Sequence, residues 1–364
     1  MEPPLYPGRF GSSPGSGVGF AGSSDASVMG TNDDATVSKA SCTKMGYVKD
    51  DFVKYFIKRF TKRAPVINRG YYARWAAVRK LLHQFLTAAP SENPNVPVKK
   101  QVLSLGAGFD TTYFQLQAEG TAPAVYYEVD FLEVTSRKMA AIAHHLELCN
   151  ILPKYAQVQK DKGEVRSSNY NLVAADLRNV SSLEEALKGA GFDPSVPTLI
   201  LAECVLIYLE AKDSEALIRW AGDKIKTGVF VIYEQIRPDD AFGQQMIRNL
   251  EMRGCPLLGI EATPTPEAKK QRFLNAGWQR AEALDMDAIY THHLAKADVQ
   301  RIEKLEIFDE FEEWHIMQEH YCIALGVSDY HQTGMFDRFG FWPTPASPRT
   351  QRRSPGTPRT PVGD

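Results

Sequence analysis

Five short, β-rich apolar runs recur along the middle of this 364-residue chain and constrain its fold more than any other feature. Nearly continuous apolar runs of this length are typical of parallel strands that are buried on both faces of a sheet. Segments with apolar residues at helical spacing lie between the runs, at 182–191 and 214–225. This alternation predicts an α/β fold, a doubly wound and mainly parallel sheet with right-handed crossovers. The runs are QVLSLG (101–106), VYYEVD (125–130), YNLVAAD (170–176), TLILAEC (198–204) and VFVIYEQ (229–235).

Further elements are expected on either side of these runs. Residues 277–286 and 320–327 can supply two final strands. Ahead of the first run, apolar residues at helical spacing predict helices at 50–60 and 71–86. Because no linker or repeat interrupts this part of the chain, we expect a single folded domain over residues 31–340.

The two ends of the chain differ from its middle in composition. Residues 1–30 are rich in Gly, Ser and Pro, and residues 341–364 are rich in Pro, Ser, Thr and Arg. Neither segment can bury enough apolar surface to offset the entropy of ordering, so both are predicted to be disordered tails. Ser-Pro and Thr-Pro pairs in the second tail suggest proline-directed phosphorylation, with an unmodified tail as the alternative. They include the pairs that begin at Ser347, Ser354, Thr357 and Thr360.

Charge and cysteine content exclude several classes of protein. The chain has 42 Lys and Arg against 44 Asp and Glu, so it lacks the basic excess typical of nucleic-acid binders. No apolar stretch approaches the ~18 residues that a membrane-spanning helix needs. There is no secretory signal, and the five cysteines form no C-x-x-C pair, which favours a reducing, cytoplasmic location. Since His315 and His320 lie five rather than four residues apart, no metal site is expected.

The first run ends in a glycine turn, Leu105-Gly106-Ala107-Gly108. In an open α/β sheet, ligands bind at the carboxyl ends of the strands, beginning with the turn after the first one. Glycines there let a ligand approach the backbone closely, although a tight turn alone would also need them. Thr111 stands where the dinucleotide-binding fingerprint has its third glycine, so no diphosphate need be held.

Acidic residues recur at the ends of the next three runs. Glu128 and Asp130 end the second run, about 20 residues after Gly106, where an acid that holds a ribose diol is expected. Asp176 closes the third run and Glu203 closes the fourth before Cys204. Carboxylates are not buried without polar partners, so they should face a polar cleft unless they are solvated or salt-bridged strand ends.

A glycine turn with acids at three strand ends predicts a nucleoside pocket. Its ligand should carry hydroxyls, a base and a positive centre, but no phosphate. S-adenosylmethionine has this profile, because its ribose needs acceptors and its sulfonium is cationic. Its carboxylate also calls for a cation, for which Lys39 and Arg74 are candidates. The residues alone do not select these two from the 42 basic side chains, and a solvated helix face is the alternative.

Six motifs in a fixed order connect the chain with a known family. They are APVINRGYYAR (64–74), SLGAGFDTTYF (104–114), YEVDF (127–131), AADLRN (174–179), LAECVLIYL (201–209) and YEQ followed by FGQQMIRNL (233–250). From about Lys39 to about Val327, the chain resembles the leucine carboxyl methyltransferases, which methylate the C-terminal leucine of the protein phosphatase 2A catalytic subunit. The resemblance implies a class I S-adenosylmethionine-dependent methyltransferase. Its sheet would have seven mainly parallel strands, an antiparallel edge strand and N-terminal helical additions.

The resemblance also implies roles for individual residues. Arg74 would bind the methionine carboxylate of the cofactor, and Glu203 would face its amino end. Asp130 would hold the ribose, and Asp176 with the next residue would border the adenine. Tyr208 would lie on the substrate side near the methyl group, so Arg74 and Tyr208 are the candidate catalytic residues. The candidate cofactor-binding residues are Lys39, Arg74, Gly106, Glu128, Asp130, Asp176, Leu177 and Glu203.

Some features on the substrate side depart from the family or leave alternatives open. Ile232 stands where the family commonly has Asn, and Ala241 where it has Arg, which affects the expected substrate contacts rather than the cofactor pocket. The connection 236–276 is longer than usual and contains many apolar residues. These residues are expected either to cap the site and hold a leucine side chain or simply to pack in the core.

The expected reaction forms a methyl ester on the C-terminal leucine and thereby regulates assembly of the phosphatase holoenzyme. A free α-carboxyl group has a pKa of about 3.3–3.7, so it is already an anion at pH 7 and needs no general base. Positioning in a water-free pocket then supplies the catalysis. The phosphatase catalytic subunit is the expected partner, and a monomeric enzyme is expected.

Three alternatives share the same scaffold. A related branch methylates the hypermodified guanosine of the wybutosine pathway in tRNA and carries a β-propeller that has no counterpart in this sequence. A small-molecule O-methyltransferase would have the same fold. A non-enzymatic, cofactor-sensing scaffold would bind the phosphatase without methylating it.

Overall fold

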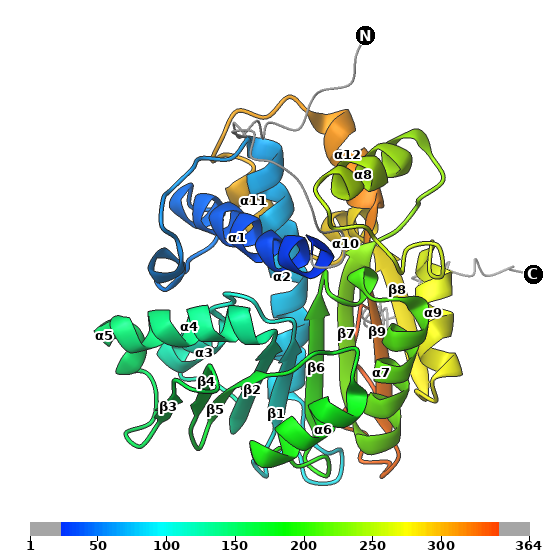
Figure 1. The fold of residues 1–364 in the computed structure, drawn as a ribbon. Coiled ribbons are helices and arrows are strands. Elements are labelled where there is room, and N and C mark those ends of the chain that lie inside the picture. The colour runs from blue at the N-terminus through cyan, green and yellow to red at the C-terminus, as the bar shows by residue number, and fades with distance from the viewer. Residues whose placement is uncertain (1–22, 342–364) are drawn as a thin grey trace, which may run out of the picture.

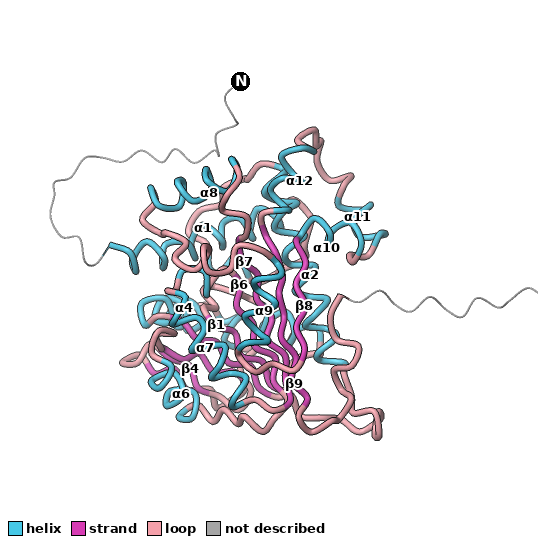
Figure 2. The backbone as a smooth tube through the Cα atoms, turned by 90° about the vertical axis from the view of Figure 1, so that its right-hand side faces the viewer, coloured by secondary structure: helices cyan, strands magenta, loops and turns pink. Residues whose placement is uncertain are grey.

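A nine-stranded sheet, with helices on both faces, forms the centre of the computed structural model, which describes residues 23–341 (Figures 1 and 2). The strand order is β3-β4-β5-β2-β1-β6-β7-β9-β8, and the five central strands from β5 to β7 are parallel. The strands are β1 (Gln101–Leu105), β2 (Val125–Asp130), β3 (Gln157–Gln159), β4 (Glu164–Arg166), β5 (Tyr170–Ala174), β6 (Thr198–Glu203), β7 (Thr227–Gln235), β8 (Arg280–Asp285) and β9 (Tyr321–Asp329).

The doubly wound α/β fold is confirmed, but the expected number of strands was too low. The seven expected strands are β5, β2, β1, β6, β7, β9 and β8, with β9 antiparallel to both of its neighbours. Two further strands, β3 and β4, pair antiparallel and extend the sheet beyond β5. Each has only three residues, and β3 is not buried, so neither leaves an apolar run in the sequence.

The helices cover the sheet on both sides and rise above the carboxyl ends of its strands (Figure 1). Among the described residues, no helix combines the length and apolar character that a bilayer span requires. The α-helices are α1 (Ser23–Lys44), α2 (Pro65–Thr87), α3 (Thr112–Glu119), α4 (Leu132–His144), α5 (Leu146–Cys149), α6 (Val180–Gly189), α7 (Ala211–Lys224), α8 (Ala241–Met252), α9 (Pro266–Asn275), α10 (Met286–His292), α11 (Lys296–Ile302) and α12 (Phe311–Glu319). Two short 3₁₀ helices are η1 (Val53–Phe56) and η2 (Leu206–Tyr208).

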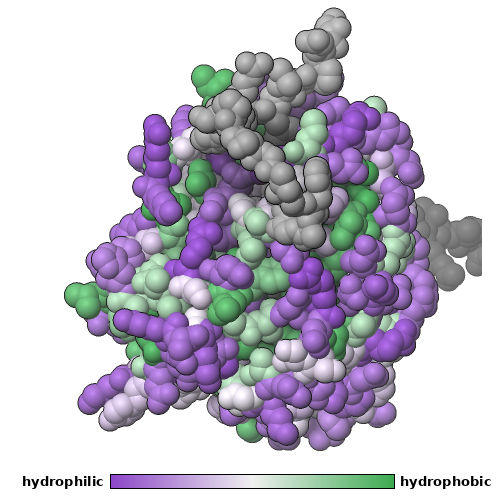
Figure 3. All heavy atoms as spheres, viewed as in Figure 1, coloured by the Kyte–Doolittle hydropathy of each residue, from purple (hydrophilic) through white to green (hydrophobic). Residues whose placement is uncertain are grey.

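Burial on both faces explains the continuous apolar runs. Successive side chains of a strand point to opposite faces, so Val102 packs in the core under α2 and α3, while Leu103 packs in the core under α6 and α7. Because a hydrophobic core covers each face of the sheet, every position of β1 is buried. On the face shown in Figure 3, hydrophobic side chains gather in the middle below α1, and hydrophilic ones surround them.

The boundaries of the folded region differ from those expected. Helix α1 begins at Ser23, inside the segment predicted to be a tail, and Phe341 is buried at the other end. Composition missed the start of α1 because polar contacts to distant residues hold it, such as Asp25 with Arg178 at 2.9 Å and Asp33 with Arg137 at 2.5 Å. The rest of both predicted tails, with the Ser-Pro and Thr-Pro pairs, lies outside the described residues.

The helices ahead of β1 also differ in extent. The helix predicted at 50–60 is only one turn, η1, whereas α2 starts at residue 65 rather than 71. Pro65 occupies the first turn of α2, where its missing N–H costs no hydrogen bond. Arg74 of α2 pairs with Glu203 at the end of β6.

Candidate active site

The carboxyl ends of β1, β2, β5 and β6 meet at one edge of the sheet, because these strands are parallel and adjacent. The turn after β1 needs both of its glycines. Gly106 has φ +59° and Gly108 has φ +51°, a region that other residues rarely adopt. A Cβ atom on Gly106 would also lie 2.5 Å from the Val205 side chain. Any side chain at this position would therefore displace the turn.

Asp130 ties the end of β2 to this turn. Its Oδ2 accepts a hydrogen bond from the Gly108 N–H at 2.7 Å, and its Oδ1 accepts one from the Phe131 N–H at 2.8 Å. Burial raises the pKa of the carboxyl group more than these two N–H donors lower it. Because each carboxylate oxygen has a second lone pair, Asp130 can still accept from the hydroxyls of a ligand.

Arg74 and Glu203 form an ion pair above the end of β6. The Nε of Arg74 donates to Oε2 of Glu203 at 2.6 Å, and both side chains are partly exposed, at 19% and 24%. Burial would lower the pKa of Arg74, but the neighbouring carboxylate raises it above its ordinary value. The guanidinium also lies over the Tyr233 ring at 4.8 Å. The pair leaves donors on the arginine and lone pairs on the glutamate for a ligand.

The segment after β5 supplies one polar and one apolar residue. Asp176 is half-buried and accepts several hydrogen bonds from Arg178, which also pairs with Asp25 of α1. Burial tends to raise the pKa of Asp176, but the hydrogen bonds from Arg178 lower it overall. Leu177 is 7% exposed and packs in the core under α6. The structure thus places an acid and an apolar wall side by side at this strand end.

Tyr208 lies in η2, directly after β6, and contacts a small apolar cluster. This cluster consists of Ile207, Met246, Leu257 and Ile260, with Tyr208 packed against it. It is built from η2, α8 and the connection after α8. Residues of the long 236–276 connection therefore pack together with η2 in a buried cluster.

Lys39 is buried beside the site, where it donates to Asp110 and Thr111 and pairs with two carboxylates. Its ammonium group lies 3.1 Å from Asp110, 3.3 Å from Asp50 and 2.5 Å from the Thr111 hydroxyl. Burial would lower the pKa of Lys39, whereas the two carboxylates raise it well above its ordinary value. Through these contacts Lys39 fixes the loop after the glycine turn.

Glu128 was expected at the site, and the structure places it elsewhere. Its side chain is fully buried one layer below Asp130, with Lys138 at 2.6 Å and the Tyr170 hydroxyl donating at 2.6 Å. Burial raises its pKa although Lys138 opposes the shift. The alternation of side chains along β2 places both acids on the same face of the strand, but only Asp130 lies at its open carboxyl end. Glu128 therefore stabilises the strand beneath the site.

The comparisons with known proteins decide the family. The family model of the leucine carboxyl methyltransferases matches residues 27–222. The chain belongs to the leucine carboxyl methyltransferase family. It is 53% identical to a leucine carboxyl methyltransferase 1 homolog from Arabidopsis thaliana, over 88% of this chain and 94% of that one. It is 36% identical to leucine carboxyl methyltransferase 1 from Bos taurus, over 85% and 92%.

A third relative is named for a different activity. The tRNA wybutosine-synthesizing protein 4 from Homo sapiens is 42% identical over 81% of this chain, but the match covers only 43% of that protein. Membership in the family confirms the resemblance read from the motifs. It makes the chain an S-adenosylmethionine-dependent methyltransferase, and S-adenosylmethionine its cofactor.

Sequence reasoning missed one residue of the methyltransferase site, Asn32 of α1. Its Oδ1 accepts a hydrogen bond from the Phe109 N–H at 2.7 Å, and it occupies the space where Gly108 would carry a Cβ. Helix α1 therefore lies across the glycine turn (Figure 1). A single polar residue in a Ser- and Gly-rich stretch gives no signal of such a contact.

Cys204, next to Glu203, is a half-buried, protonated thiol rather than a nucleophile. Its backbone is left-handed at φ 56°, and its N–H donates to the Tyr233 carbonyl at 2.7 Å. Burial raises the pKa of the thiol to about 11, so the group stays protonated at neutral pH. The hydrogen bond turns the chain from the end of β6 into η2.

We expect Lys138→Met to destabilise the fold strongly, because it leaves the buried Glu128 carboxylate without its cation. The free energy of unfolding in urea should fall by about 3–5 kcal/mol. A double variant, Glu128→Leu with Lys138→Met, should recover most of this loss. As a control, Lys224→Met breaks the exposed pair with Glu184 and should leave the stability nearly unchanged. Equal losses from both lysine variants would contradict this account.

We expect Gly106→Ala to weaken binding of S-adenosylhomocysteine, measured by calorimetry, by at least about tenfold. The added methyl group would push Val205 and the turn apart. Gly120→Ala is the matched control, since Gly120 has φ +69° but nothing within 4 Å. Both variants carry a backbone cost of about 1–2 kcal/mol, but only the first should lose affinity. Similar affinities for the two variants would exclude the turn from the cofactor site.

Proposed function

We propose that this methyltransferase transfers the methyl group of S-adenosylmethionine to the α-carboxylate of the C-terminal leucine of a protein phosphatase 2A-type catalytic subunit. The product is a methyl ester, which regulates assembly of the phosphatase holoenzyme. The match along 94% of the Arabidopsis relative's length supports this substrate. The five cysteines are free thiols in the structure, which supports a cytoplasmic location for the enzyme.

The Arg74–Glu203 pair is the observation that supports the site most directly. An amino acid end with one carboxylate and one ammonium group needs a cation and an anion side by side, and this pair presents both, partly exposed. In this proposal Arg74 binds the methionine carboxylate and Glu203 the ammonium group. Asp130 accepts from the ribose hydroxyls above the Gly106 turn, and Asp176 with Leu177 borders the adenine. Lys39 supports the loop through Asp110.

The chemistry asks little of the side chains beyond positioning. The cofactor, when bound, supplies an electrophilic methyl group on a sulfonium. The acceptor carboxylate has a pKa of about 3.3–3.7 and is already an anion, so no residue need remove a proton. Burial raises the pKa of Tyr208 well above its ordinary value, so its hydroxyl remains a hydrogen-bond donor at neutral pH. It can orient the acceptor carboxylate toward the methyl group.

The apolar cluster beside Tyr208 suits the side chain of a C-terminal leucine. Met246, Leu257 and Ile260 are buried, and the partly buried Phe242, Ile247 and Leu250 pack against them. Ile232, a departure from the family pattern, is fully buried in the core under α7, and Ala241 opens α8 after Asp240. Neither lies in this cluster, so the leucine-binding surface is independent of both departures.

Methylation of a tRNA nucleoside is the second candidate function. The human wybutosine-synthesizing protein is more similar to this chain, at 42% identity, than the bovine leucine carboxyl methyltransferase, at 36%. Against it, the chain has a net charge of −2 and offers no excess of cations for a phosphate backbone. The protein carboxylate remains the better supported acceptor.

A labelling experiment should separate the two candidates. The protein is incubated with methyl-labelled S-adenosylmethionine and one acceptor at a time. The three acceptors are the intact phosphatase, the phosphatase lacking its last leucine, and tRNA. We expect base-labile label on the intact phosphatase alone, because only a carboxyl ester hydrolyses under mild base. Label on tRNA, or on neither phosphatase, would refute the proposed substrate.

We expect Arg74→Gln to raise the KM for S-adenosylmethionine by roughly 10- to 100-fold, the effect of losing hydrogen bonds between charged groups. Arg79→Gln is the matched control on the same helix, because Arg79 pairs with Glu119 away from the site. Its KM should stay within about twofold of wild type. An unchanged KM in Arg74→Gln would show that this residue does not bind the cofactor.

A further inference from the structure

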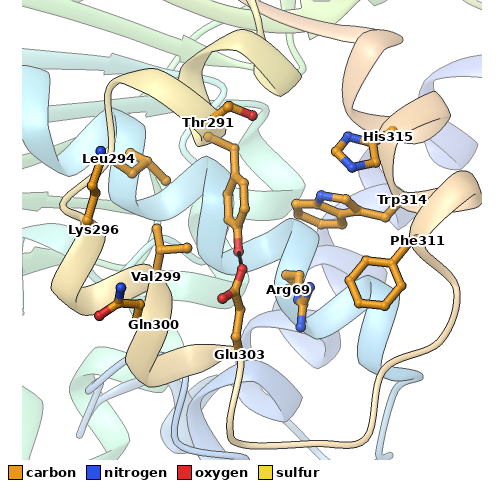
Figure 4. Close-up of a pocket in the computed structure, with 11 residues that line it drawn as sticks. Arg69, Thr291, Leu294, Lys296, Val299, Gln300, Glu303, Phe311, Trp314 and His315 are labelled. Carbon is orange, nitrogen blue, oxygen red and sulfur yellow. Dashed lines mark hydrogen bonds between the residues drawn. The ribbon is translucent and has the colours of Figure 1, made fainter.

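A second cavity lies outside the methyltransferase site. It has a volume of about 320 Å³ and opens between α2, α10, α11 and α12 (Figure 4). Its lining includes Arg69, Tyr290, Leu294, Val299, Phe311 and Trp314, none of which belongs to the site described above. The volume falls in the range of small-ligand sites, which begins at about 300 Å³.

Arg69 is an unpaired buried cation in this cavity. The residue is 3% exposed, and its guanidinium stacks over the Phe308 ring at 3.6 Å and over Trp314 at 5.8 Å. Within residues 23–341 it has no hydrogen bond and no ion pair, and its buried Nε has no acceptor. Two other buried cations, Lys39 and Lys138, do have carboxylate partners. A buried charge without a counter-ion is costly, so the fold keeps Arg69 at the expense of stability.

The walls around Arg69 are mainly apolar. Trp314, Leu294 and Val299 are buried or half-buried, while Phe311 is 55% exposed at the rim. Figure 4 shows the side chains of Phe311 and Trp314 on one side of Arg69 and Glu303 on the other. The Glu303 carboxylate accepts from the Tyr290 hydroxyl at 3.3 Å and forms no ion pair with Arg69. The cavity thus joins one desolvated cation to aromatic and branched apolar surfaces.

We propose that this cavity binds a small organic carboxylate with an apolar, preferably planar body. The carboxylate would accept from the free N–H groups of Arg69, a geometry that guanidinium groups favour. The body would lie against Trp314 and Phe311, with Leu294 and Val299 on the opposite wall. The ligand chemistry is shared by a free aromatic acid and by the C-terminal carboxylate of a peptide ending in an apolar residue. The inference stands apart from the proposed function, because no residue is common to the two sites.

Calorimetric titration of the full-length protein tests this inference. S-adenosylhomocysteine is kept at saturation so that the cofactor site does not contribute. The probes are 3-phenylpropanoate, its uncharged analogue 3-phenylpropanamide, and the tripeptide Ala-Ala-Phe with a free carboxylate. We expect the acid to bind at least about tenfold more tightly than the amide. Binding of the tripeptide as well would identify a peptide end as a ligand source, and binding of the acid alone would identify a free acid.

Two variants locate the binding. Arg69→Met keeps the packing on Phe308 and Trp314 but removes the charge, so it should abolish the preference for acid over amide. Its melting temperature without ligand should not fall, because an unpaired buried charge has been removed. Val299→Phe fills the cavity without changing Arg69 and should weaken binding of the acid. Arg219→Met, on the exposed side of α7, should bind as wild type does.

Several results would overturn the inference. These are equal affinity for acid and amide, no binding of the acid at about 1 mM, or unchanged binding in Arg69→Met. A large fall in the melting temperature of Arg69→Met would show that the charge serves the fold rather than a ligand. The Val299→Phe variant, which retains Arg69, then still tests whether the acid occupies this cavity.

Discussion

Parallel pairing of β1 with both β2 and β6 is the constraint on which the site depends. It brings the ends of four strands to one edge, so residues far apart in the chain become neighbours there. This edge holds the glycine turn, Asp130, Asp176 and Glu203, because each of them ends or follows one of the parallel strands. The long helix α2 crosses above β6 and places Arg74 at the same edge. Without the parallel register, these residues would lie at opposite ends of the sheet.

Around this edge, the pairing of charged side chains changes with their depth below the surface. At the deepest level, Glu128 and Lys138 form a fully buried ion pair below the site. One level up, Lys39 holds Asp50 and Asp110 and thereby stiffens the loop after the turn. At the opening, Arg74 and Glu203 are partly exposed and keep free donors and lone pairs. The gradient gives a rigid support beneath groups that can still exchange partners with a ligand.

Arg69 does not follow this gradient. It is as buried as the supporting charges, yet it lacks a counter-ion among the described residues. Aromatic rings on one side of it replace only part of the lost hydration. The contrast with Arg74, five residues later on the same helix, shows how one helix can present cations both to the methyltransferase site and to a separate cavity.

The sequence by itself determined the α/β class, the seven main strands, the glycine turn and the family. These features depend on local patterns, such as apolar runs, strand-end acids and contiguous motifs, which a linear chain displays directly. Only the tertiary structure separated Asp130 from Glu128, because two positions on one face of a strand differ solely in depth. Only the tertiary structure showed that Lys39 contacts the loop after the glycine turn, that α1 begins at Ser23, and that Arg69 has no counter-ion among the described residues. Each of these findings depends on burial and on partners that lie far away in the chain. Local sequence patterns indicate neither the burial nor the partners.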